Sequence, residues 1–174
     1  MSQPTQQRRR FEAWGRQHGE AVRGYLRAMV RRAVVADDLT QEVFCRAWQA
    51  RHRYREEGNA RAYLFRIADR LACDYGRKAG REVDLNEESW RAVEPAGRGE
   101  GPLETLSRAE RARQVTAALD RLSHLQRRVL LMRYYGQMSF SDIAEIVGCP
   151  LNTALSHCHR GLRALRKLLV EDVP

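Results

Sequence analysis

Apolar side chains recur every three or four residues along most of the chain, which places them on one face of an α-helix. The periodic stretches are separated by short segments rich in glycine, proline and small polar residues. The pattern predicts helices over residues 8–33, 37–51, 60–78, 103–122 and 123–136, and two more within 139–168. We therefore expect an all-α protein.

The first three helices are long enough to share one small core. A break is expected at residues 34–36, followed by Asp37 or Asp38 as the cap of the second helix. Glu42 and Arg46 stand four residues apart on its flank, the spacing of a helical ion pair. The buried face of this helix should hold Leu39, Val43 and Ala47, with Trp48 as a further candidate.

Arginines follow one side of the third helix. Arg66, Arg70 and Arg77 lie along its outward side, with Tyr63 at its head. Such a stripe is either a solvated surface, the usual outcome, or a surface that follows a phosphate backbone. The spacing leaves both interpretations open.

A helix-turn-helix is indicated near the C-terminal end. Ser139 or Ser141 can cap its first helix, Gly148 can adopt a positive φ, and Pro150 prevents that helix from continuing. The preceding helix is expected to stop at Gly136. The apolar stripe of the last helix should hold Leu155, Cys158, Leu162, Leu165 and Leu169.

This turn chemistry favours DNA recognition over an ordinary helical hairpin with a solvated basic face. In a helix-turn-helix the second helix enters the major groove, so its outward polar residues are the candidate contacts. They are Thr153, Ser156, His157, His159, Arg160 and Arg163.

Charge divides the chain into three segments. The 174 residues carry 31 Lys and Arg against 22 Asp and Glu, a formal net charge of +9. Residues 1–80 carry +8, residues 81–105 carry −4 and residues 106–174 carry +5. Glycine and proline accumulate in the middle segment, where the periodicity disappears. We expect two small basic domains, 1–80 and 106–174, joined by a flexible acidic linker, 81–105.

The composition narrows the function classes. A strong positive charge is typical of proteins that bind nucleic acid, although coding bias explains the arginine excess equally well. No apolar run approaches the length of a membrane span and the first residues lack a signal-peptide core, so we expect a cytoplasmic protein. The four cysteines lack the paired spacing of metal ligands, and Cys158 falls on the apolar stripe. No metal, cofactor or catalytic motif is predicted.

Three blocks in this order resemble bacterial sigma factors of the extracytoplasmic-function (ECF) type. ADDLTQEVFCRAW, residues 36–48, is similar to the family's core-polymerase-binding segment. RAYLFRIADRLACDYGRK, residues 61–78, is similar to its promoter −10 helix. LQRRVLLMRYYGQMSFSDIAEIVG, residues 125–148, leads into the −35 reader. The likeness covers the chain except for the linker and the first few residues.

The resemblance implies a dissociable polymerase subunit and not an enzyme. The second helix would bind core RNA polymerase at the clamp helices of the largest subunit, and its contact residues would be Asp38, Gln41, Glu42 and Phe44. The third helix and the loop at 52–60 would capture separated −10 DNA, using Tyr63, Arg66, Arg70 and Arg77. The helix-turn-helix would contact the −35 major groove, and the polymerase would hold the two domains apart on the promoter.

The resemblance also implies an anti-sigma factor as a partner, which we expect to be membrane-anchored. The chain departs from the family at two places. Asp69-Arg70 stands where many members have Arg-Asn, and in the recognition helix Leu155 and His157 replace a lysine and an arginine. Because each lost phosphate contact lowers affinity, we predict weaker −35 binding than is usual, unless Leu155 packs inward. Arg160 and Arg163 would offset part of the loss.

The main alternative is a free-standing helix-turn-helix repressor or activator. Such a protein would bind duplex operator DNA by itself, usually as a dimer on symmetric half-sites. The first domain and the acidic segment have no obvious use in that interpretation. Binding to core polymerase distinguishes the two.

Overall fold

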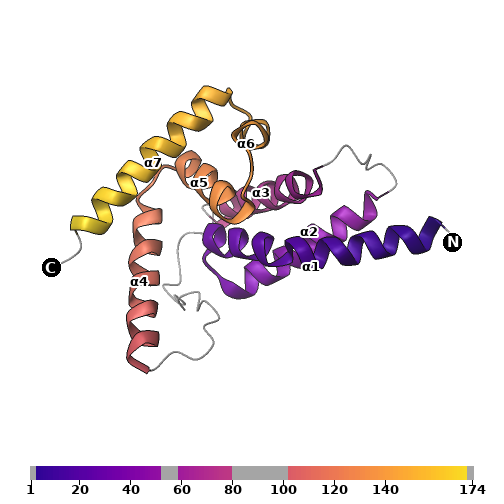
Figure 1. The fold of residues 1–174 in the computed structure, drawn as a ribbon, viewed down its shortest axis with the longest axis horizontal. Coiled ribbons are helices and arrows are strands. Elements are labelled where there is room, and N and C mark those ends of the chain that lie inside the picture. Colours follow the sequence, from indigo (N-terminus) through magenta and orange to yellow (C-terminus); the bar gives the residue numbers. More distant parts are fainter. Residues whose placement is uncertain (1–2, 52–58, 80–101, 172–174) are drawn as a thin grey trace.

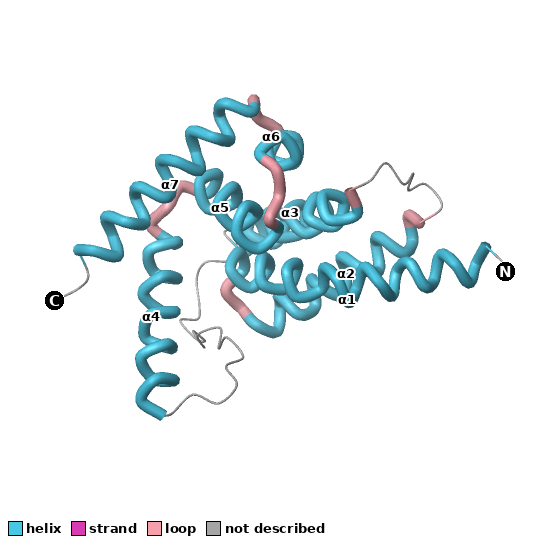
Figure 2. The backbone as a smooth tube through the Cα atoms, viewed as in Figure 1, coloured by secondary structure: helices cyan, strands magenta, loops and turns pink. Residues whose placement is uncertain are grey.

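Seven α-helices and no strand make up the described part of the chain in the computed structural model, which covers residues 3–51, 59–79 and 102–171 (Figures 1 and 2). The all-α prediction is confirmed. The acidic linker predicted at 81–105 lies outside the described residues except for its last four, which belong to a helix. The helices are α1 (Gln3–Val30), α2 (Ala33–Gln49), α3 (Ala60–Ala79), α4 (Pro102–Asp120), α5 (His124–Gly136), α6 (Phe140–Val147) and α7 (Leu151–Glu171).

The break between α1 and α2 lies three residues earlier than the sequence predicts. Arg31 adopts φ 62°, a left-handed conformation that ends α1, and Arg32 is extended before α2 begins at Ala33. The expected break at 34–36 and the expected Asp37 or Asp38 cap are both wrong. The side chain of Asp37 instead accepts hydrogen bonds from Arg23 at 2.7 and 2.8 Å, which ties α2 to α1.

The first lobe consists of α1, α2 and α3 packed around one core. Trp14 and Leu71 extend this core at its margins. Its fully buried members come from all three helices and include Val22, Tyr25, Leu26, Val43, Ala47, Leu64, Phe65 and Ala68. The predicted inward positions Val43, Ala47 and Leu64 are confirmed.

The second lobe consists of α4 to α7. Ser123 and Gln126 form a capping box at the start of α5. Ser139 caps α6 by accepting from the backbone N–H of Asp142 at 3.1 Å, so of the two predicted serines it is the first that caps. Gly148 has φ 73°, as the turn requires. Helix α5 includes Gly136 as its last residue, and Gln137 takes the left-handed cap position in place of glycine.

The apolar stripe of α7 is only partly as predicted. Cys158 is buried and Leu165 packs against the core, but the side chains of Leu155 and Leu162 are 41% and 54% exposed. Small residues take the inner positions: Ala154 is fully buried, and a Cβ on Gly161 would lie 2.8 Å from Cδ1 of Leu130 in α5. The two helices therefore cross closely, and the leucines are turned outward.

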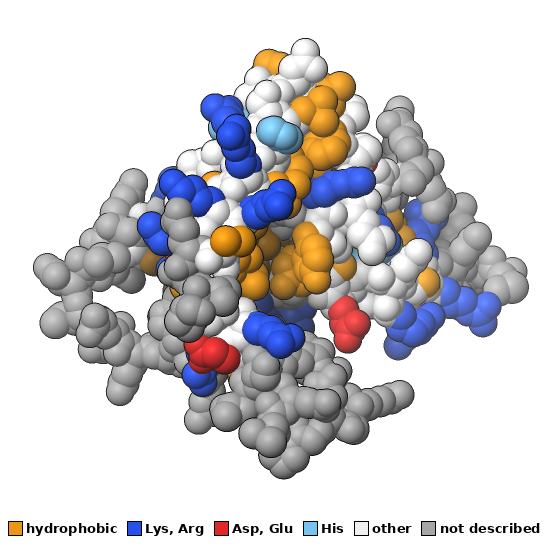
Figure 3. All heavy atoms as spheres, turned by 60° about the vertical axis from the view of Figure 1, so that its left-hand side comes forward, with side chains coloured by type: hydrophobic (Ala, Val, Ile, Leu, Met, Phe, Trp, Pro, Cys, Tyr) orange, Lys and Arg blue, Asp and Glu red, His pale blue; other side chains and the backbone are white. Residues whose placement is uncertain are grey.

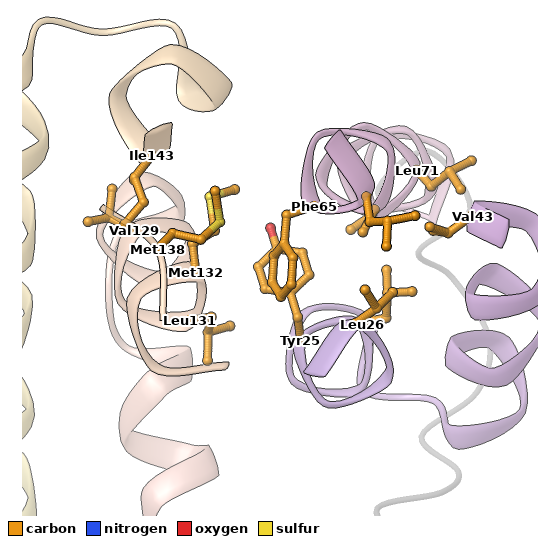
Figure 4. Packing of buried hydrophobic residues seen from close by; sticks show 14 of the residues in the cluster. Tyr25, Leu26, Val43, Phe65, Leu71, Val129, Leu131, Met132, Met138 and Ile143 are labelled. Carbon is orange, nitrogen blue, oxygen red and sulfur yellow. The ribbon is translucent and has the colours of Figure 1, made fainter. Parts of the chain in front are cut away.

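The two lobes touch each other in this structure (Figure 1). Helix α5 packs against α1 and α3, and α6 packs against α3. Tyr25 and Phe65 of the first lobe face Met132 and Met138 of the second, so buried apolar side chains continue from one lobe into the other (Figure 4). The charge pattern predicts separable domains but gives no sign of this contact.

Candidate polymerase and DNA interfaces

The predicted polymerase-binding residues of α2 divide between its outer face and its inner face. Asp38 and Gln41 are exposed. Val34 and Trp48, 75% and 38% exposed, continue the same stripe at helical spacing. Phe44 turns inward and packs against the core.

Glu42 lies on the flank of this outer face. It accepts from Arg46 at 2.6 Å, as its spacing predicts. Asp37 lies at the beginning of this face and is tied to α1 by the hydrogen bonds from Arg23, which also lower the pKa of its carboxyl group.

The outer face of α2 thus combines apolar ends with a polar centre. Trp48, a candidate for the buried face, lies on this outer face, so that placement is wrong. The helical spacing of Val34 and Trp48 with Asp38 and Gln41 was the signal that could have placed both residues here.

The predicted −10 residues lie along one side of α3. Arg66, Arg70 and Arg77 are exposed, which confirms the outward stripe. Tyr63 is half-buried, and its ring lies 6.4 Å from the ring of Trp14 in an edge-on arrangement. The three arginines thus lie on one exposed surface of α3, where Arg66 pairs with Glu145 and Arg77 with Asp74, while Tyr63 is partly withdrawn into the first lobe.

Asp69 lies on α3 between these arginines but points the other way. It is only 4% exposed. Tyr25 donates to its Oδ1 at 2.7 Å, and Arg128 of α5 donates to both carboxylate oxygens at 2.8 and 2.6 Å. Sequence reasoning treated Asp69 as a departure from a family pattern and missed this pairing.

The pKa values of the two partners of Asp69 reflect the site. Burial and the neighbouring carboxylate raise the pKa of Tyr25 well above its usual value, so its hydroxyl remains a donor. Burial would lower the pKa of Arg128, but its hydrogen bonds to Asp69 outweigh that effect and raise it. The pair is therefore a charge-assisted, two-bond contact in a largely desolvated place.

The predicted −35 residues lie on α7, the second helix of the helix-turn-helix. Ser156, His159, Arg160 and Arg163 are exposed. Thr153 and His157 are half-buried, and Nδ1 of His157 is buried without a hydrogen-bond partner among the described residues.

Exposed Leu155 lines a shallow depression on this helix together with Ser156, His159 and Arg160. The alternative that Leu155 packs inward is wrong, because inner positions are already occupied by Ala154 and Cys158. A second depression follows along the helix, lined by Arg160, Arg163, Ala164, Arg166, Lys167 and Val170. Figure 3 shows basic and hydrophobic side chains interleaved on the side of the molecule that α4 and α7 form. Such a surface can follow phosphates while its apolar members contact base edges.

Further polar contacts join the two lobes at the C-terminal end of α1. Arg127 donates to the backbone carbonyls of Ala28 and Met29 near the end of α1, at 3.0 Å for Met29. Asp120 of α4 forms ion pairs with Arg31 and Arg127. These contacts place cations at the C-terminal end of α1, where the helix dipole favours them.

The described residues do not carry a metal-binding constellation: no three His, Cys, Asp or Glu side chains among them gather closely enough to hold an ion. None of the helices in the described ranges is both long and apolar enough to cross a membrane. Cys158 packs in the core as expected.

Two family profiles match the chain, one on each lobe. The profile described as Sigma-70 region 2 matches residues 16–82, and the profile described as Sigma-70, region 4 matches residues 112–165. The first covers the second half of α1 with α2 and α3, and the second covers the end of α4, all of α5 and α6 and most of α7.

Individual relatives agree with the profiles. The ECF RNA polymerase sigma factor SigC of Mycobacterium tuberculosis is 32% identical over 136 residues, which are 75% of this chain and 68% of the relative. SigK of Mycolicibacterium vanbaalenii, also an ECF RNA polymerase sigma factor, is 26% identical over 160 residues, 91% of this chain and 81% of the relative. Among solved structures, the sigma factor RpoE of Bartonella quintana, in complex with the anti-sigma factor NepR, superposes with a TM-score of 0.74 at 26% identity, covering 93% of this chain and 98% of that one.

Proposed function

Because the chain belongs to the ECF RNA polymerase sigma factors, we propose that its two lobes bind core RNA polymerase and the −10 and −35 elements of a promoter, and so direct transcription initiation. The observation that carries the proposal is the order of the two family matches on two helical lobes, the second of which ends in a capped helix-turn-helix. The protein acts as a polymerase subunit in this account. We place it in the cytoplasm with the polymerase.

The outer face of α2 is the proposed polymerase contact. Asp38 and Gln41 supply its polar centre and Val34 and Trp48 its apolar ends. Half-buried Phe44 supports this face from within the core. Reversing the charge of Asp38 with Asp38→Arg should weaken capture by core polymerase, whereas Glu20→Arg, the same change at an exposed site on α1, should not. An equal loss of polymerase binding in both variants would refute the proposal that the outer face of α2 is the polymerase contact.

The exposed side of α3 is the proposed −10 contact, and the outward side of α7 is the proposed −35 contact. Arginine suits both because its guanidinium binds phosphate oxygens, and guanine edges, through two hydrogen bonds. Arg163→Ala should weaken binding of −35 duplex and lower the slope of affinity against salt by about one. Arg111→Ala, which removes the same charge from an exposed site on α4, is the matched control.

We also propose control by an anti-sigma factor. The support is the structural relative from Bartonella quintana, which was solved in complex with one. Co-purification of the chain with a protein that blocks its transcription in vitro would identify that partner.

Transcription in vitro with core polymerase on a library of promoter sequences tests the function directly. The proposal requires transcripts that depend on the added chain and start downstream of a shared pair of sequence elements. A chain that binds duplex DNA alone and neither binds core polymerase nor stimulates transcription would be a free-standing repressor or activator.

A further inference from the structure

Basic side chains continue along the outer face of α7 beyond the predicted −35 contacts. Arg166 and Lys167 are exposed there and line the second depression of this helix. Both follow the stretch that the Sigma-70, region 4 profile matches, which ends at residue 165. The chain carries no acidic residue between Glu145 and Glu171. The positive charge of this face is therefore not compensated along the helix before its last residue.

Two guanidinium groups on this face are available to a ligand. Among the described residues, neither Arg163 nor Arg166 forms an ion pair with a carboxylate. Exposed arginines elsewhere in the chain do pair with acidic neighbours, as Arg66 does with Glu145. An unpaired guanidinium is weakly hydrated and holds a phosphate through two hydrogen bonds. It therefore loses little when it exchanges water for a phosphate.

The helix presents these cations on a fixed scaffold. It packs on α4, α5 and α6. Ala164 and Leu165 pack against the core on its inner side, between the exposed cations. The last turns of α7 thus continue as a packed helix past the helix-turn-helix, and charged groups on a packed helix are held more precisely than groups on a loop.

The length of α7 decides what these cations can reach. An α-helix rises 1.5 Å per residue, so Lys167 lies about 16 Å along the axis from Ser156. The major groove is about 12 Å wide. When the first turns of α7 contact base edges, its last turns therefore lie at the edge of the groove, beside a phosphate backbone. Homeodomains, a variant of the helix-turn-helix, contact the backbone with the same end of their recognition helix.

We propose that Arg166 and Lys167, continuing from Arg163, bind backbone phosphates of duplex DNA beside the −35 element. The inference rests on the proposed function, since it assumes that the first half of α7 reads that element. Contacts to phosphate carry no base information. The site therefore adds affinity and fixes the position of α7 on the duplex without changing the sequence that the helix reads.

The direct test combines Arg166→Ala with Lys167→Ala in the full chain. The matched control combines Arg111→Ala with Arg121→Ala, which removes two positive charges from exposed sites elsewhere on the second lobe. Fluorescence anisotropy with two unrelated mixed-sequence duplexes of about 24 base pairs measures binding without a known promoter. All four substitutions lie at exposed positions, so helical circular dichroism should be unchanged.

The expected loss is independent of sequence. At about 0.1 M salt the Arg166/Lys167 double variant should bind both duplexes on the order of tenfold more weakly than the wild type. Its slope of log affinity against log salt should be lower by about two. The Arg111/Arg121 double variant should stay close to the wild type in both quantities.

A second measurement locates the phosphates on the promoter. It uses the −35 duplex that the promoter library yields, extended by about ten base pairs, or one helical turn, at one end or at the other. Because α7 has one orientation in the groove, extension at one end only should tighten binding of the wild type. The Arg166/Lys167 double variant should lose this gain, and the control pair should keep it.

The outcomes separate this proposal from the function it rests on. Equal affinities and salt slopes in the Arg166/Lys167 and Arg111/Arg121 double variants would overturn the phosphate site, even if the promoter library gives transcripts. A loss confined to one of the two mixed sequences would also overturn it, since that result would indicate base reading. Absence of transcripts, with the Arg166/Lys167 double variant still weaker than its control on both duplexes, would overturn the sigma function and leave the duplex contact of α7 in place.

Discussion

Replacing Gly24 by alanine tests the contact between the lobes without removing any charge. The new Cβ would lie 2.6 Å from Cδ1 and from Cε1 of Tyr135, which is closer than real Cβ contacts come. In the same helix, a Cβ on Gly19 would meet nothing within 4 Å. Both substitutions replace a glycine inside α1 by alanine, but only the one at Gly24 brings the new Cβ into contact with the ring of Tyr135.

The expected change in the free energy of unfolding follows from two opposing effects. Alanine is favoured over glycine in a helix interior by about 1 kcal/mol. Gly19→Ala should raise the free energy of unfolding by about that amount and the Tm by about 2–4 °C. At Gly24 the same gain is opposed by displacement of a packed ring, and overpacking of this kind costs about 1–3 kcal/mol. We expect Gly24→Ala to be less stable than Gly19→Ala by about 1–3 kcal/mol.

Urea unfolding followed by far-UV circular dichroism measures the difference, and small-angle scattering shows whether the lobes have parted. Tyr135→Ala provides an internal check, because it removes the ring that clashes. In that background Gly24→Ala should become stabilising, a coupling that a double-mutant cycle reports. Equal stability of Gly24→Ala and Gly19→Ala in the wild-type background would refute the described packing of Tyr135 on α1.

Three further predictions concern single sites. Leu155→Lys should tighten −35 duplex binding and steepen its salt dependence by about one phosphate contact; the same effect from Leu162→Lys, at the other exposed leucine, would mean that added charge alone is responsible. Burial, with Arg61 nearby, lowers the pKa of His18 below its usual 6.5, so stability should fall as the pH drops below that value and the unfolded chain takes up the proton. His18→Gln should flatten this dependence in urea titrations, and an unchanged pH profile would exclude His18 as its source. Gly148→Ala should lower the Tm by about 2–4 °C, since φ 73° strains alanine although the surrounding space is free, and an unchanged Tm would contradict the left-handed turn.

The helices that the sequence predicts well are those with a chemical signal at their ends. Helix α3, predicted at 60–78, spans Ala60–Ala79, and Asn59 accepts from the backbone N–H of Ala62 at 3.0 Å, as a cap does. The break before α2 was misplaced because Arg31 takes a left-handed conformation. Arginine has no local preference for that conformation. The end of α1 at Arg31 therefore depends on tertiary contacts, which the local sequence does not reveal.

The outward arginine stripe of α3 was predictable from the sequence, and the contact between the lobes was not. An outward arginine stripe follows from helical period alone, so Arg66, Arg70 and Arg77 could be named from the sequence. Asp69 and Arg128 are 59 positions apart, on helices of different lobes. A single charged residue carries no information about such a distant partner. The net charge of each domain did not predict the pair either, because both domains are positive.

The buried carboxylate on α3 has a consequence for how DNA could be bound. Once the lobes part, Asp69 loses Arg128 and keeps the hydrogen bonds from Tyr25 and Cys73 of the first lobe, close to a stripe that is proposed to hold a phosphate backbone. An unpaired carboxylate there repels phosphate, so opening weakens rather than favours DNA binding at that point of α3. Strand capture at this point of α3 is therefore opposed by Asp69. In this account the free energy that opens the chain comes from contacts elsewhere, above all from the outer face of α2 on the polymerase, which makes promoter binding conditional on assembly with the enzyme.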